Sequence, residues 1–452
     1  MKLSSLRIRF ALAVLTMLAT PFAWAARAED SGASKQLNDL FAREWEFRLR
    51  EDPLQATSVG RHEYDDRLPS MAPETLAQRA ETRRKFLAEM ASVDLTQVSR
   101  ESQVSAAIWK RQLEIAIQGY ELGDDQLPWN ADSGFHTEFA RQPEEMPLTN
   151  AREYENYLGR LRAWPRYANE QMALAKKGLA RGMTVAAATL RGYEGTFGSH
   201  VVEKVEDSVF WKPFANFPAS ISESDRARLQ TEGRKAITEN VIPTYRALRD
   251  FFVAEYLPQA RTTLGALALP DGEAFYRLKI REFTTLDLSP QAIHDIGLAE
   301  VARIQAEMQE VIKKTGFQGD FAAFLQFLRS DPRFYAKTPE ELLMRASWIA
   351  KRMDGQLPRF FGKLPRIPYT VEPVPDYLAP KYTSGRYVGS APDGSRAGIY
   401  WVNTYKLSVR PLYNLEALSL HEAVPGHHLQ GALAQELGNL PPHRRYSYIS
   451  AF

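Results

Sequence analysis

Apolar side chains along this chain recur mainly at intervals of three and four residues, which is the spacing of one face of an α-helix. A clear example is the stripe formed by Val301, Ile304, Met308 and Val311. Similar patterning covers roughly 34–52, 75–94, 98–121, 150–181, 224–258 and 410–421. We expect these stripes to pack together in the core of a mainly α fold, with Pro165 kinking or splitting its helix.

Several helix ends are marked by local signals. Ser289 before Pro290 is a favourable N-cap followed by proline at the first helical position, and Gly316 stands where a C-cap is expected. Thr338 and Glu341 form a capping box, in which Glu341 can reach back to the Thr338 amide. These signals predict helices that begin after Ser289 and after Thr338.

The segment from about 365 to 405 has a different pattern. Prolines crowd its first half, and the β-branched and aromatic residues Tyr387, Val388 and Ile399–Val402 follow. Between them, residues 391–396 contain an Asp-Gly pair typical of turns. This pattern predicts a small β-hairpin or sheet, whose exposed edge could hold an extended peptide by backbone hydrogen bonds.

The first 28 residues have the layout of a secretory signal peptide. Lys2, Arg7 and Arg9 precede an apolar run from 10 to 24, and small-x-small cleavage sites follow at 23–25 and 26–28. The run is too short to favour a spanning helix, although an uncleaved anchor is the alternative. We expect a periplasmic or secreted protein without stable membrane insertion after cleavage, forming a single domain over 29–452.

Charge and cysteine content narrow the classes of function. Removing residues 1–28 takes away four of the 57 basic residues and none of the 55 acidic ones, so the net charge changes from +2 to −2. A near-neutral chain has no electrostatic footprint for nucleic acid, which we do not expect as a partner. Without cysteine there is no disulfide and no residue to carry a lipoprotein's lipid.

The candidate chemistry lies within 410–437. Three histidines, His421, His427 and His428, fall within eight residues of one another, and Glu422 follows the first of them. Neutral imidazoles suit Zn²⁺, and a carboxylate beside a ligand can act as general base on water. On a straight helix His427 would face away from His421, while His428 would lie about 10.5 Å further along. The break at Pro425-Gly426 could fold His427 back beside His421.

The segment 421–430 resembles the signature of the DUF885 family, a set of bacterial and often exported proteins grouped with zincin-like metallopeptidases. Residues 393–400, Asn403 and 289–297 also resemble that family's pattern. The resemblance implies a large helical zincin-like (gluzincin-type) architecture with a small β element before the metal-binding helix. It further implies a zinc cofactor, His421 and His427 as ligands and Glu422 as base, with His428 as the alternative second ligand.

The resemblance also implies a third ligand, a glutamate in a segment of the family that would come after residue 452. We therefore expect the chain to be truncated at its C-terminus, with that ligand outside it. Glu436 is the one acidic residue after the histidines, and we interpret it as a solvated helix residue.

The function expected from these features is metal-assisted hydrolysis of a peptide or small amide by an exported enzyme, with Glu422 as general base. Arg396, Tyr400 and Asn403 precede the metal helix and are candidates for substrate contact or oxyanion stabilisation. A zinc amidase or esterase with a non-peptide substrate, and a non-catalytic metal- or peptide-binding protein, are the alternatives. The truncated chain itself could be inactive.

Overall fold

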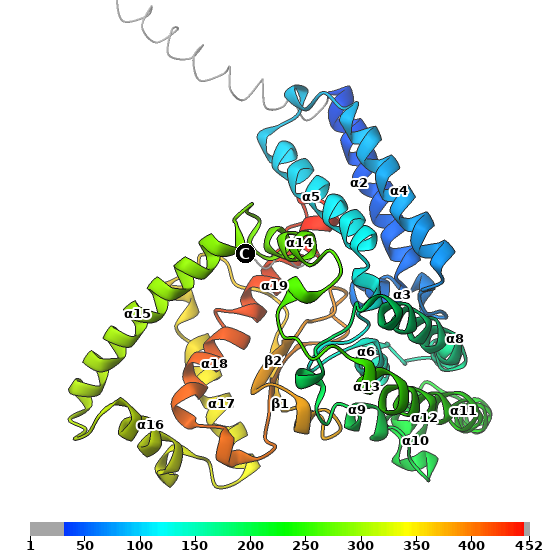
Figure 1. Ribbon diagram of the computed structural model, residues 1–452. Coiled ribbons are helices and arrows are strands. Elements are labelled where there is room, and N and C mark those ends of the chain that lie inside the picture. Colours follow the sequence, from blue (N-terminus) through cyan, green and yellow to red (C-terminus); the bar gives the residue numbers. More distant parts are fainter. Residues whose placement is uncertain (1–30, 447–452) are drawn as a thin grey trace, which may run out of the picture.

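The structure is a computed structural model that describes residues 31–446 and is mainly helical (Figure 1). The predicted signal peptide at 1–28 lies outside this range. Within the described range no helix is both long and apolar enough to cross a bilayer. The helices of eight or more residues are α2 (Gly32–Glu51), α4 (Pro73–Ala91), α5 (Arg100–Leu122), α8 (Ala151–Arg181), α11 (Glu223–Ala236), α12 (Ile242–Phe251), α14 (Gly272–Thr284), α15 (Pro290–Thr315), α16 (Phe321–Ser330), α17 (Pro339–Asp354), α18 (Leu415–Glu422) and α19 (His427–Gln435).

Short helices connect these elements. They are α3 (Pro53–Ser58), α6 (Phe135–Phe139), α7 (Gln142–Glu145), α9 (Gly195–Gly198), α10 (Lys212–Ala215), α13 (Leu257–Gln259) and α20 (Pro442–Arg445). Single π-helical turns at Ile237–Val241 and Phe252–Tyr256 join α11, α12 and α13 into one nearly continuous rod. The helix at 151–181 also runs unbroken through Pro165, so the predicted split does not occur.

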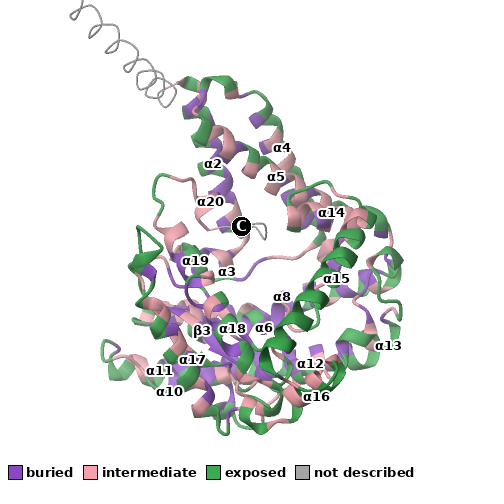
Figure 2. Cartoon of the chain, turned by 90° about the vertical axis from the view of Figure 1, so that its left-hand side faces the viewer, coloured by how far each residue is buried: buried purple, intermediate pink, exposed green. Residues whose placement is uncertain are grey.

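Two helical cores occupy the N-terminal half. In the first, α2, α4 and α5 pack side by side around Trp109 and Leu37, both without exposed surface. The second is larger and rich in aromatic rings, and it lies between α8 and the α11–α12 rod around Trp164 and Tyr245. In Figure 2 the buried residues concentrate in this body and around the sheet.

The predicted hairpin is present, with an additional strand. β2 (Gly385–Val388) pairs antiparallel with β3 (Gly398–Val402), so that Tyr387 lies opposite Tyr400. β1 (Tyr369–Pro373) pairs parallel with the other side of β3, which gives the order β1-β3-β2 and makes β2 an edge strand. Helices α17 and α18 cover the face that contains Tyr400.

The predicted helix caps are largely present. Ser289 Oγ accepts a hydrogen bond from the Ala292 amide, and Gly316 ends α15 with φ +73°. Thr338 Oγ1 accepts from the Glu341 amide, but the Glu341 carboxylate accepts from the Lys337 amide rather than from Thr338. The side chain of Glu341 therefore caps the residue before the one predicted.

The stripe on α15 is not part of a core. Val301, Ile304, Met308 and Val311 are 54%, 44%, 38% and 55% exposed, because α15 contacts mainly its neighbours α14 and α16 and none of the other described elements covers its apolar face. Figure 2 shows this helix as almost wholly exposed. The prediction that its stripe packs in the core is wrong for the described residues.

Candidate metal centre

The His-rich segment is divided between two helices. α18 ends at Glu422 and α19 begins at His427, and the four residues between them form one widened, irregular turn, here called the return. The Gly426 amide donates to Leu420 O at 2.9 Å and the His428 amide to Ala423 O at 3.0 Å, so both bonds span more residues than a regular helical turn. The Val424–Pro425 peptide bond within this return is cis.

Gly426 permits the return because of the space that it leaves. A Cβ atom built on Gly426 would lie 1.9 Å from the carbonyl oxygen of His421, far inside any real contact. The φ of Gly426 is −76°, which every residue can adopt, so the requirement for glycine is steric. Close approach of these two backbone segments is what brings His427 back to His421.

The return gathers two imidazoles and one carboxylate. Ligand atoms of His421, Glu422 and His427 all lie within 4.8 Å of one another, and the two histidine rings are 4.7 Å apart between centroids. His427 Nε2 lies 4.0 Å from Glu422 Oε2. Tetrahedral zinc with bonds of about 2.1 Å holds donors about 3.4 Å apart, so small side-chain movements would let the two imidazoles share one Zn²⁺. The two histidines therefore match such an ion, and the Glu422 carboxylate lies beside them.

A backbone amide of the sheet holds the Glu422 carboxylate in place. The amide of Tyr387 donates to Glu422 Oε2 at 2.8 Å, while Oε1 accepts no hydrogen bond from any described residue. Because this amide faces Glu422 rather than β3, it belongs to the free edge of β2. One carboxylate oxygen is thus held in place, and the other is left to act on a proton.

His428 lies apart from this group. Its side chain is buried, with Nδ1 3.0 Å from the Tyr387 hydroxyl and its ring 4.6 Å from that of Tyr369. Burial lowers the pKa of His428, and a hydrogen bond to the Ile367 backbone partly opposes this shift. The structure therefore places His428 against the sheet and leaves His427 as the histidine next to His421.

Of the three predicted substrate contacts, two are occupied by internal bonds. Tyr400 has no exposed surface, its hydroxyl lies 3.3 Å from Ser419 Oγ, and burial raises its pKa to about 12. Asn403 is equally buried, and its Nδ2 donates to three carbonyl oxygens of the loop before β2. Both residues shape the sheet from inside, whereas Arg396 lines an open cavity.

Two other residues complete the surroundings. Glu436 is absent from the metal-ligand group, but it is not the solvated helix residue predicted: its side chain is only 12% exposed, accepts a hydrogen bond from the Arg366 amide at 2.7 Å and forms ion pairs with Lys363 and Arg366. Tyr387 is the residue that sequence reasoning missed, because its contact with Glu422 is made by a backbone amide that no side-chain pattern reveals.

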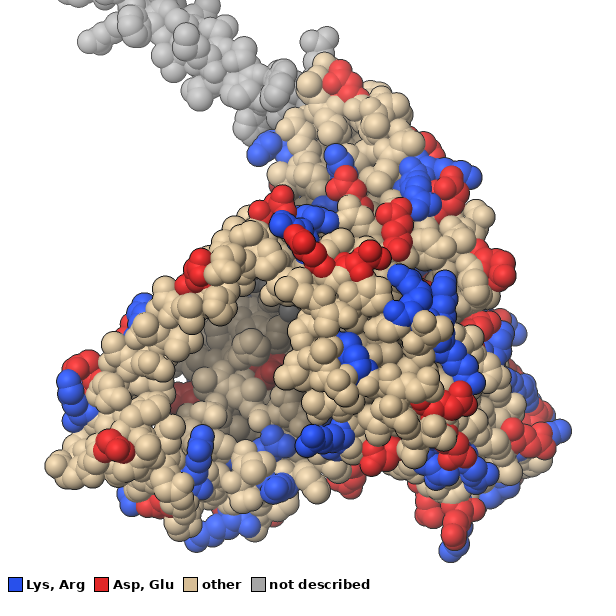
Figure 3. All heavy atoms as spheres, viewed as in Figure 1, with Lys and Arg blue, Asp and Glu red and all other residues tan. Residues whose placement is uncertain are grey.

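The site is accessible from outside. His421 is exposed, and Figure 3 shows a hollow between α15 and the body of the molecule. In the matching view of Figure 1, α18, α19 and β2 lie behind this hollow. Through the exposed His421, the metal-ligand group is thus open to solvent.

Comparison with known proteins places the fold but assigns no activity. A crystal structure described as a putative lipoprotein from Colwellia psychrerythraea is similar over 92% of this chain and 75% of that one, with a TM-score of 0.83 at 23% identity. A protein described as a putative lipoprotein of unknown function from Shewanella oneidensis is similar over 92% and 74%, with a TM-score of 0.59 at 14% identity. No curated protein matches the chain. The family model described as "Bacterial protein of unknown function (DUF885)" matches residues 53–452, and the chain therefore belongs to the DUF885 family.

Proposed function

We propose that this protein is an exported zinc-dependent hydrolase that acts on peptides, with a zincin-like arrangement of its site. The observation that carries the proposal is the convergence of His421, Glu422 and His427 next to the free edge of β2. Export is supported by the signal-like N-terminus and by the description of the two similar structures as putative lipoproteins.

The three residues have separate roles in this proposal. His421 and His427 hold the metal through imidazole nitrogens, which zinc prefers in proteins. Zinc, when bound, supplies a Lewis acid and lowers the pKa of bound water towards neutrality. Glu422 accepts the proton of the attacking water and passes it to the leaving amine nitrogen, while the Tyr387 amide keeps its carboxylate oriented.

The edge of β2 provides the peptide's binding surface. Backbone groups of an antiparallel strand alternate between its two sides, so the carbonyl of Tyr387 shares the free side with the amide that holds Glu422. Because the Tyr387 amide is already bonded to Glu422, an extended peptide would pair with this edge through the Tyr387 carbonyl, and its backbone would then lie beside Glu422. This surface favours a peptide over an ester or amide that lacks an extended backbone.

Glu422→Gln tests the assignment of the base. We expect the variant to keep zinc at the parental stoichiometry and to lose at least about 100-fold in peptide hydrolysis, because general base catalysis contributes roughly 10²–10⁴-fold. Metal content is measured by mass spectrometry after dialysis, and turnover with a quenched-fluorescence peptide library. Full activity in this variant would refute the role of Glu422.

His421→Ala and His427→Ala test the metal site itself. Each should abolish stoichiometric zinc, whereas His294→Ala, which removes an exposed histidine on α15, should leave it unchanged. A parent protein that binds no zinc would exclude the proposal. A zinc-loaded parent that cleaves esters or modified amides but no peptide would replace it with the non-peptide alternative.

A further inference from the structure

A separate cavity lies beyond the end of β2. It encloses about 900 Å³ between the N-terminal helices α2–α5 and the loop that joins β2 to β3. Its wall includes Val388, which directly follows Tyr387, the residue whose amide holds Glu422. A smaller pocket of about 130 Å³ contains Tyr387 and shares four lining residues with the large cavity. Strand β2 thus leads from the candidate metal centre into this space.

The charges in the cavity do not all pair. Its lining contains five arginines and five carboxylates, and four of the carboxylates are in ion pairs: Glu44 with Arg48, Glu51 with Arg79, and both Glu138 and Glu145 with Arg141. The fifth, Asp52, caps α3, and burial raises its pKa. Arg83 and Arg396 have no carboxylate oxygen within 4.0 Å among residues 31–446. The cavity therefore contains two guanidinium groups without a counter-ion.

Arg396 is the one of these two that lies at the end of β2. Its Nη1 donates to the carbonyl oxygen of Gly389 at 2.7 Å, and its Nε is buried without an acceptor from the described residues. Burial lowers the pKa of Arg396. A partly buried guanidinium without an anionic partner is unfavourable, so a ligand that brings a carboxylate would improve its environment.

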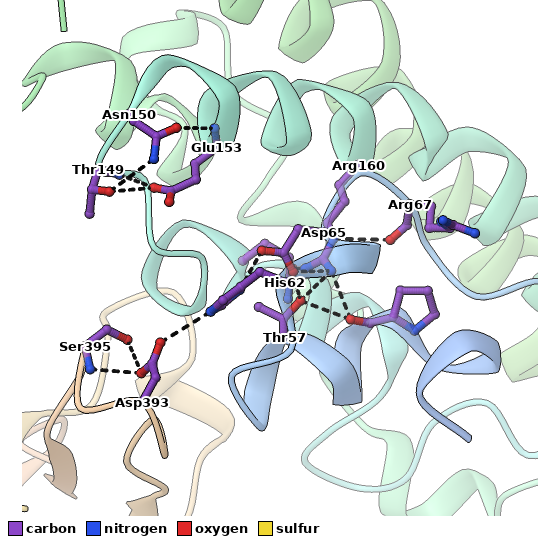
Figure 4. Close-up of polar contacts among 12 residues, drawn as sticks. Thr57, His62, Asp65, Arg67, Thr149, Asn150, Glu153, Arg160, Asp393 and Ser395 are labelled. Carbon is purple, nitrogen blue, oxygen red and sulfur yellow. Dashed lines mark hydrogen bonds and ion pairs between the residues drawn. The ribbon is translucent and has the colours of Figure 1, made fainter. Parts of the chain in front are cut away.

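The loop that carries Arg396 is tied to the N-terminal half of the protein. Figure 4 shows His62 between two carboxylates, with Nδ1 2.8 Å from Asp65 and Nε2 3.3 Å from Asp393 on this loop. Asp65 is buried and also lies 3.4 Å from Arg160, which has no exposed surface. These contacts hold the loop, and with it Arg396, against a fixed part of the structure.

The distance along β2 sets where a ligand's anionic group would lie. An extended strand rises about 3.3 Å per residue, so Gly389 is about 7 Å along the chain from Tyr387. Consider a peptide that lies along this edge of β2 with its reacting carbonyl beside Glu422. The part of this peptide that reaches Arg396 would lie two or three residues from the bond to be cleaved.

We propose that Arg396 binds a carboxylate of the substrate, so that the preferred substrates are short peptides with a carboxylate two or three residues from the cleaved bond. This inference rests on the proposed peptidase function and names the substrate class of that site. An α-carboxylate at the peptide C-terminus and the side chain of Asp or Glu offer the same chemistry to the guanidinium.

Four fluorescent peptides of equal length test the proposal on the zinc-loaded Glu422→Gln protein, in which binding is measured by anisotropy. The first has uncharged side chains and a free C-terminal carboxylate, and the second is its C-terminal amide. The third is this amide with one internal Glu, and the fourth has Gln at that position. We expect at least tenfold tighter binding of the free acid than of its amide, or of the Glu peptide than of the Gln peptide. Whichever pair shows the difference identifies the source of the carboxylate.

Variants at Arg396 then locate the preference. Combined with Glu422→Gln, Arg396→Gln should bring the carboxylate peptides to the affinity of the neutral ones, and Arg396→Lys should retain part of the preference because it keeps the charge. Arg345→Gln, on the exposed face of α17, is the matched control and should change nothing. Equal binding of all four peptides, or a preference that survives Arg396→Gln, would overturn the proposal.

Failure of this proposal can be told apart from failure of the peptidase function. Hydrolysis by the parent with no carboxylate preference in binding would leave the peptidase standing and remove the role of Arg396. A preference that depends on Arg396 without hydrolysis of any peptide by the parent would support the carboxylate site and remove the peptidase. The comparison of acid and amide peptides alters only the ligand, so it does not depend on the folding of a variant.

Discussion

Replacing Gly426 by alanine is the most direct test of the chain return that assembles the candidate metal centre. The new Cβ atom would lie 1.9 Å from His421 O and 2.7 Å from Leu420 O, both backbone atoms at the end of α18. No side-chain rotation can relieve these contacts. The backbone of α18 or the start of α19 must therefore move, and each carries one of the two histidines.

The size of the movement follows from the geometry. Real Cβ atoms essentially never lie within 3.0 Å of such atoms, so His421 O and residue 426 must separate by about 1.1 Å. Zinc–ligand distances tolerate about 0.2 Å, and altering even the groups that orient a ligand costs roughly 10–100-fold in metal affinity. We expect zinc affinity to fall by at least about 100-fold, or about 2.7 kcal/mol. Overpacking should lower the free energy of unfolding of the metal-free protein by a further 1–3 kcal/mol or so.

The assay is competition for zinc with a chromophoric chelator, accompanied by urea unfolding of the metal-free protein. Gly431→Ala is the matched control, because Gly431 lies within α19 and a Cβ atom there would meet nothing within 4 Å. The control should bind zinc as the parent does and be equally stable or up to about 1 kcal/mol more stable. If Gly426→Ala kept zinc affinity within threefold of the parent, the tight return would not be what positions the ligands.

Three further outcomes follow from the structure. In Gly398→Ala the new methyl group would press against the Tyr387 hydroxyl and His428, so we expect the free energy of unfolding measured in urea to fall by about 1–3 kcal/mol. Unchanged stability would show that these two side chains move aside freely. Burial lowers the pKa of His200 from 6.5 to about 3, so the unfolded chain takes up a proton at a higher pH than the folded protein does. The contribution of neutral His200 to the free energy of unfolding is therefore complete above pH 6.5 and is lost as the pH falls towards 3. Between pH 7 and pH 5 this costs about 2 kcal/mol, and His200→Phe should flatten that part of the urea-measured pH profile, while an identical profile would contradict the assignment. Asp393→Asn removes the ion pair with His62, which is worth about 0.5–1 kcal/mol, and should therefore speed tryptic cleavage after Arg396 about two- to fivefold at constant pH. An unchanged cleavage rate would mean that other contacts hold the loop.

Local signals in the sequence were sufficient for many of the elements. The caps at Ser289 and Thr338 and the turn between β2 and β3 depend on residues only a few positions apart, and each lies where the pattern predicts it. The break at Pro425-Gly426 could be located in the same way, because proline and glycine act on the backbone that contains them. The family could also be recognised from local motifs, and the match to residues 53–452 confirms it.

Contacts between distant segments could not be obtained in this way. Periodicity shows which residues share a helix face but not whether another element covers it, so the stripe on α15 is exposed although its pattern resembles that of a core helix. Tyr400 and Asn403 have side chains suited to a substrate, yet packing of the sheet buries both. Only the tertiary structure decides such cases, because burial depends on which elements lie opposite a residue.

The candidate metal centre combines both kinds of information. The sequence alone supplies the residue types, His421, Glu422 and His427, together with a break that makes their irregular spacing usable. Their meeting within 4.8 Å, and the support of Glu422 by the Tyr387 amide, depend on how α18 and α19 pack against an edge strand some 35 residues earlier in the chain. Side-chain chemistry is a property of each residue, whereas the distance between two such groups is set by the packing of the whole domain.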